Sequence, residues 1–82
     1  MSAQAAAIAQ IRRGVRMVLA DERCFGVLSS GERIAVALVL DRHDLLEQAW
    51  GTIAESMHRL GPSWTEAALQ VQREGWDEEE AR

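Results

Sequence analysis

The fold is decided by one stretch, Ser29–Leu46, which reads Ser-Ser-Gly-Glu-Arg-Ile-Ala-Val-Ala-Leu-Val-Leu-Asp-Arg-His-Asp-Leu-Leu. Its seven consecutive apolar residues, Ile34–Leu40, stand between two polar clusters that favour turns. A membrane-spanning helix needs about 20 apolar residues, so the run predicts the buried central element of a small domain. Ser29 precedes Glu32 with the spacing of a capping box, which favours a helix. A buried strand is the alternative, because periodicity does not separate the two in a short run containing Ile and Val.

Length and composition restrict the class of protein. The chain has 82 residues, enough for one domain, and a domain of this size buries only about 60% of the surface of its unfolded chain. Little volume is left for an enclosed active site, so we expect no enzyme and no cofactor. The single cysteine, Cys24, excludes an internal disulfide, and the N-terminus lacks the basic-then-apolar order of a signal peptide. We therefore expect a cytoplasmic protein that does not enter a membrane.

The N-terminal segment, residues 3–20, has the pattern of an amphipathic helix. Several alanines favour a helix, and the large apolar residues recur at spacings of three and four and so form one stripe, made of Ile8, Ile11, Val15, Val18 and Leu19. Arg12, Arg13 and Arg16 fall within an arc of about 100° beside that stripe. Gly14 interrupts the far side of the helix, at a cost of up to about 1 kcal/mol relative to Ala. We expect Phe25, Val27 and Leu28, in the connection that follows, to close one end of the fold.

Residues 45–60 carry a second apolar face, formed by Leu46, Ala49, Trp50, Ile53, Met57 and Leu60. Asp44 with Glu47 repeats the capping pattern ahead of it. Thr52 with Glu55 could restart the helix after Gly51, so the segment forms either one helix or two short helices bent at Gly51. We favour a single helix.

The C-terminal part predicts one more helix and a tail. Gly61-Pro62 ends the preceding helix, and Ser63 with Glu66 has the spacing of a cap for a last helix, on which Trp64, Ala67, Ala68 and Val71 form the apolar face. The fold class is therefore all-α: a small bundle of about four helices in a single domain, residues 1–75. Four acids in succession mark 76–82 as an acidic, flexible tail.

Two constellations resemble catalytic or metal sites without matching one. Cys24 and His43 could supply a nucleophile and a base, but no third orienting group or nucleophile-elbow motif accompanies them. Asp41, His43, Asp44 and Glu47 offer four metal-ligand side chains, but their spacing fits neither an EF-hand loop nor a zinc motif. We expect neither catalysis nor metal binding at these positions.

The candidate partner-binding residues are Arg12, Arg13, Arg16 and Trp76. The three arginines are the one concentrated positive patch and could pair bidentately with carboxylates or phosphates, or could be a solvated flank that pairs with acids such as Glu22 or Glu74. Trp50 and Trp64 lie on apolar stripes and are expected in the core. Trp76 follows Gly75 outside any apolar pattern, so it either folds back over the end of the bundle or stays available as an aromatic anchor for a partner.

The segments Leu28–Leu40 and Leu60–Trp64 are similar to those of small bacterial, phage and mobile-element proteins, although no named family is matched. That resemblance implies an accessory or inhibitory protein that binds a larger partner.

The function expected from the sequence is therefore a non-enzymatic protein–protein interaction module. The alternative is a small DNA-associated regulator that uses the arginines of the first helix, but a net charge of −4 makes nucleic acid the less favoured partner. A homodimer through the apolar stripe of residues 3–20 or of residues 45–60 is expected as well. Met17 and Leu45 lie outside these stripes, so they would add apolar surface that a single chain does not bury.

Overall fold

The computed structural model describes residues 3–49 and 52–76. Within those ranges the chain forms five α-helices and one 3-10 helix and contains no strand, which confirms the all-α class. The elements are α1 (Ala3–Ala20), η1 (Glu22–Val27), α2 (Ser30–Val39), α3 (His43–Ala49), α4 (Ile53–Leu60) and α5 (Pro62–Glu74). None of these helices is both long enough and apolar enough to cross a bilayer.

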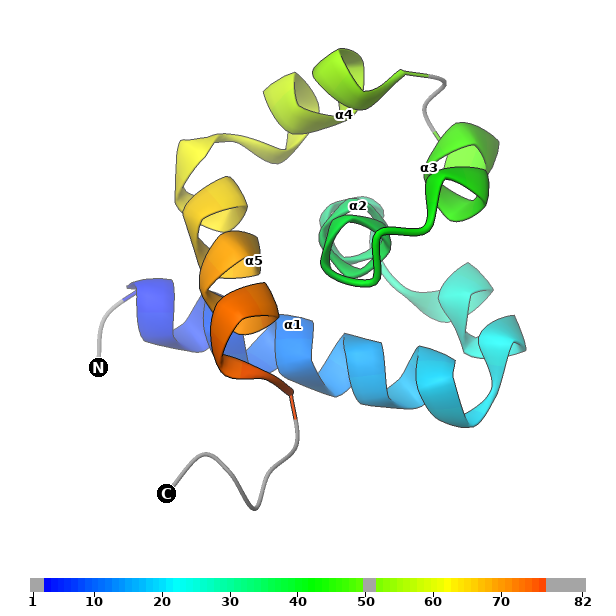
Figure 1. The fold of residues 1–82 in the computed structure, drawn as a ribbon, viewed down its shortest axis with the longest axis horizontal. Helices are drawn as coiled ribbons and strands as arrows, with labels where there is room; N and C mark the ends of the chain where they lie inside the picture. Colours follow the sequence, from blue (N-terminus) through cyan, green and yellow to red (C-terminus); the bar gives the residue numbers. More distant parts are fainter. Residues whose placement is uncertain (1–2, 50–51, 77–82) are drawn as a thin grey trace.

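The apolar run forms the helix at the centre of the fold. In Figure 1 α2 is viewed nearly end-on, with α1, α3, α4 and α5 around it, and it packs against all four. The capping box is present: the Ser29 hydroxyl accepts from the Glu32 amide at 3.3 Å, and the Glu32 carboxylate accepts from the Ser29 amide at 2.9 Å. Residues 34–37 and Val39 are buried, but Leu38 and Leu40 are only partly buried: Leu38 lines a surface hollow, and Leu40 is the C-cap of the helix.

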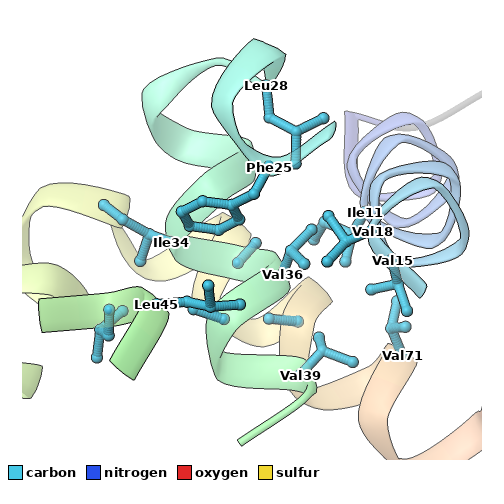
Figure 2. Close-up of a cluster of buried hydrophobic side chains, with 14 of the residues drawn as sticks. Ile11, Val15, Val18, Phe25, Leu28, Ile34, Val36, Val39, Leu45 and Val71 are labelled. Atoms are coloured by element: carbon cyan, nitrogen blue, oxygen red, sulfur yellow. The ribbon is translucent and has the colours of Figure 1, made fainter. Parts of the chain in front are cut away.

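The long N-terminal helix has the expected bounds, and its stripe residues Ile11, Val15 and Val18 are buried (Figure 2). Two expectations about this helix are wrong. Leu19 is 58% exposed, because it lies at the margin of the stripe, about 100° around the helix from Val18, which is buried in the same turn. Gly14 lies on the inner side rather than the far side: a Cβ there would be 2.9 Å from Val36 Cγ2, so its lack of a side chain lets α1 approach α2 closely.

Phe25 and Leu28 close one end of the core as expected, and both are buried (Figure 2). Val27, between them, is 75% exposed and does not take part. Leu45 is also buried, so it is not the surplus apolar surface that the dimer expectation assumed, and Met17 is partly buried against the core. The homodimer stays a prediction without this support.

The described parts of segment 45–60 belong to two helices, α3 ending at Ala49 and α4 beginning at Ile53, so the favoured single helix is wrong. Thr52 has extended backbone angles (φ −121°, ψ 156°), and its hydroxyl accepts from the Glu55 amide at 3.1 Å. This cap satisfies a free N–H at the start of α4, so local hydrogen bonding competes with continuation of the preceding helix. Gly51 and Trp50 lie outside the described residues.

Two other expected caps are placed differently. Helix α3 begins at His43, so Asp44 lies in its first turn rather than before it, and its carboxylate pairs with Arg42. Helix α5 begins at Pro62, with Gly61 (φ 89°) as the N-cap, so Ser63 lies inside the helix. Proline is favoured at the first helical position, since its missing N–H would have no partner there. The expected tail lies outside the described residues from Asp77 onward.

Candidate interaction groove

Two of the three predicted arginines hold the end of the last helix. Arg12 Nε donates to the Gly75 carbonyl at 3.2 Å, and its Nη2 lies 3.3 Å from a Glu74 carboxylate oxygen. Arg16 Nη1 donates to the Trp76 carbonyl at 3.0 Å. We call these contacts the C-terminal clasp. The carbonyls belong to Gly75, the C-cap of α5, and to Trp76 after it, so both guanidinium groups lie where the chain leaves the helix, near the negative end of the helix dipole, where cations are favoured.

The clasp forms because α1 and α5 pack side by side, which brings residues about 60 positions apart in the chain together (Figure 1). Arg13 does not take part: it is exposed, and its guanidinium makes no hydrogen bond or ion pair with any residue in the described ranges. The structure therefore does not present the three arginines as one free patch. Their role in partner binding stays a prediction.

Trp76 is partly buried and packs against the core. Its main-chain carbonyl is an acceptor of the clasp. Of the two arrangements expected for this residue, the structure shows the one in which it folds back. Trp64 is also partly buried against the core, in agreement with its place on the apolar stripe.

Most of the exposed large apolar side chains lie on a surface away from the clasp. A cavity of about 370 Å³ opens between the C-terminal end of α2 and helices α3, α4 and α5. Three large hydrophobic residues around it, Ile53, Met57 and Leu69, are each 41–43% exposed. We call this hollow the groove; its lining residues are Ala37, Leu38, Asp41, Arg42, His43, Leu46, Ile53, Met57, Thr65, Ala68, Leu69 and Gln72.

The groove exists because α4 covers the core incompletely. Ser56 is the one residue of α4 that is fully buried, and its hydroxyl donates back to the Thr52 carbonyl at 2.8 Å. Ile53 and Met57, four residues apart, share a face of α4 but remain half exposed. The opposite wall is α5, where the Thr65 hydroxyl is bonded to the Gly61 carbonyl at 2.7 Å. The hydroxyls of Ser56 and Thr65 therefore already have acceptors within their own helices.

One end of the groove is fixed by polar contacts. Gln72 Nε2 donates to the carbonyls of Leu38 and Val39, at 3.3 and 3.2 Å, and so joins α5 to the end of α2. Arg42 binds Asp44 through two hydrogen bonds of 2.9 and 2.7 Å. These bonds lower the pKa of Asp44 to about 2.

The same end carries more negative than positive charge. Arg42 also lies 3.3 Å from a Glu22 carboxylate oxygen, so two acids share this guanidinium. The Asp41 side chain is 85% exposed, with the ring of His43 3.8 Å away. In the described part of the chain, no three His, Cys, Asp or Glu side chains are placed to hold a metal ion. The groove can therefore offer apolar contact and negative charge to a partner.

Sequence reasoning missed this site because it placed Ile53 and Met57 on a buried face. Leu69 carried a signal that could have indicated it: it is a large hydrophobic residue outside the apolar stripe of α5. No protein-family model matches the chain, and neither a curated protein nor a solved structure matches it.

Proposed function

We propose that this chain is a non-enzymatic protein-interaction module that binds a larger partner through the groove. The observation that carries the proposal is the gathering of Ile53, Met57 and Leu69, three of the five exposed large hydrophobics in the described residues, around one cavity of about 370 Å³. An apolar hollow with a polar rim has the anatomy of the central part of a protein interface. An accessory or inhibitory role, in which a small chain occupies a site on a larger protein, fits such a surface.

The energy available from the groove indicates how it would be used. Burying a large aliphatic side chain completely contributes about 1.5–3 kcal/mol. With about two fifths of each side chain left to bury, the three residues together would supply about 2–4 kcal/mol. Association costs about 4 kcal/mol or more in lost translational and rotational freedom. The groove would therefore act as the hot spot of a wider contact, with the surrounding surface contributing the remainder.

A nucleic-acid partner has less support from the geometry. Binding to phosphates requires several unengaged cations, whereas Arg12 and Arg16 are bonded to the end of α5 and Arg42 is bonded to two acids. We therefore favour a protein partner over DNA.

The proposal is tested by cross-linking followed by affinity measurement. A photoreactive amino acid placed at Leu69 in cells of the source organism should capture a protein that the same group at Val27 does not capture. Val27 is a suitable control because it is even more exposed, at 75%, and does not line the groove.

The captured protein is then purified, and its affinity is measured for the wild type and two variants. Leu69→Glu should weaken binding by about tenfold or more, which corresponds to about 1.4 kcal/mol. Val27→Glu, an equal change of charge and polarity, should leave binding unaltered. Equal binding by wild type and Leu69→Glu, with loss in Val27→Glu, would contradict the proposal.

A further inference from the structure

We infer that the groove receives an amphipathic α-helix with a basic end from the partner protein. Two large apolar side chains of that helix would fill the cavity, and a Lys or Arg would lie at the end occupied by Asp41. This inference rests on the proposed function and names the kind of partner that the same surface fits.

A helix is the occupant because the groove lacks what other peptide-binding modes require. An extended peptide adds to the edge of a sheet, and the described residues contain no strand. A polyproline segment docks on aromatic side chains, and no Phe, Tyr or Trp is among the lining residues. A phosphorylated peptide needs unengaged arginines, and the arginine that lines the groove, Arg42, already binds Asp44 and Glu22.

The walls also have the spacing of a helix surface. Ile53 and Met57 are one helical turn apart on α4, and Thr65 and Leu69 are one turn apart on α5. Side chains four residues apart on a docking helix have the same pitch, so they can lie between such ridges. The thioether of Met57 can adapt its shape to the side chain that enters.

The volume of the groove limits the number of anchors. A cavity of about 150 Å³ accepts one benzene ring, so about 370 Å³ accepts roughly two large side chains. Outside the groove, the exposed large hydrophobics of the described residues are Leu19 on α1 and Val27 on η1, so a second copy shows no helix with two exposed apolar anchors one turn apart. We therefore assign the groove to a helix of another protein rather than to a second copy of this chain.

The charge near the groove determines the sign of the helix end. Glu22 and Asp44 pair with the Arg42 guanidinium, and Asp41 lies 3.8 Å from the ring of His43, so the carboxylates and the guanidinium at this end sum to −3 + 1 = −2. Asp41 is the acid of this set that Arg42 does not bind, and its side chain is 85% exposed. It lies in the turn after α2, with a positive φ of 55°. Opposite charge on the partner would both steer association and fix the direction of the helix in the groove.

The test uses designed helical peptides and the full chain. The basic peptide carries two leucines one helical turn apart and three lysines at one end. The acidic peptide has glutamates in place of the lysines. The proline peptide is the basic peptide with a central, solvent-facing proline. Binding is measured by fluorescence anisotropy at low and high salt. At low salt the basic peptide should bind about fivefold or more tightly than the acidic one, and high salt should reduce that ratio. The proline version should bind at least about tenfold more weakly, since proline disrupts the helix.

Asp41→Asn should lower the preference for the basic peptide, and it tolerates the positive φ because Asn adopts that region readily. The matched control is Glu55→Gln, an exposed acid of α4 that does not line the groove, which should leave the preference unaltered. Equal binding of the basic and acidic peptides, or full binding by the proline version, would overturn the inference. If the captured partner still depended on Leu69 in that case, the proposed function would stand with a different kind of occupant.

Discussion

The close approach of α1 and α2 at Gly14 leads to a prediction opposite to the one that helix propensity gives. Gly14→Ala within a helix should stabilise the fold by about 1 kcal/mol. In the structure, however, the new Cβ would lie 2.9 Å from Val36 Cγ2, and Val36 is fully buried and cannot move toward solvent. Overpacking of this kind costs about 1–3 kcal/mol. We expect a net loss of about 1 kcal/mol in the free energy of unfolding.

A double-mutant cycle separates the two effects. Val36→Ala alone should destabilise by about 2 kcal/mol, because it removes buried methyl groups and leaves a cavity. In that background Gly14→Ala no longer meets Cγ2, and it should stabilise by up to about 1 kcal/mol. The expected coupling energy between the two sites is about 2 kcal/mol.

The assay is urea denaturation followed by circular dichroism, with thermal unfolding as a second measure. A loss of about 1 kcal/mol should lower the Tm by about 4–8 °C in a domain of this size. Gly31→Ala is the control: it lies in the first turn of α2 with nothing within 4 Å of the new Cβ, so it should be neutral or stabilising. The packing explanation is refuted if Gly14→Ala stabilises as Gly31→Ala does, or if Val36→Ala leaves its effect unchanged.

Three further predictions concern polar contacts. Arg12→Ala should lower the free energy of unfolding by about 1–2 kcal/mol through loss of the clasp, whereas Arg13→Ala should change it by less than about 0.5 kcal/mol; urea denaturation measures both. Carboxyl NMR titration should give Asp44 a pKa of about 2, and Arg42→Ala should return it toward 3.8. Because the pKa is lowered in the folded state, the Asp44–Arg42 contact should stabilise the fold above pH 3.8 and lose its effect as the pH falls through about 2. Ser29→Ala should destabilise by about 1 kcal/mol in thermal unfolding, since the capping box loses its hydroxyl acceptor.

Local signals in the sequence were sufficient to predict several elements. The recurrence of apolar residues at spacings of three and four over 3–20 predicted the bounds of α1. The capping pair Ser29 and Glu32 favoured a helix over a strand for the central segment. The end of α4 before Gly61-Pro62 was also predictable from the local sequence, because proline cannot continue a preceding helix.

The remaining features depend on contacts between distant segments. Gly14 is not one of these features: it stands three residues after Ile11 and four before Val18, so helical spacing alone places it beside the apolar stripe. The burial of Leu45, by contrast, depends on how α3 packs against α2. The clasp joins residues about 60 positions apart, which no local pattern encodes. The groove results from the incomplete cover of the core by α4. Amphipathic periodicity predicts which face of a helix is turned inward, but not how deeply each residue on that face is buried.

The role of the groove is tested most directly by NMR mapping of the purified partner on the isotope-labelled chain. Binding should perturb the amides and methyl groups of the lining residues most strongly, above all those of Ile53, Met57 and Leu69. Resonances of Val27 and Leu19, which are exposed apolar residues away from the groove, should remain unaltered. Perturbations centred on Val27 and Leu19, with the groove resonances unchanged, would show that the interaction surface lies elsewhere.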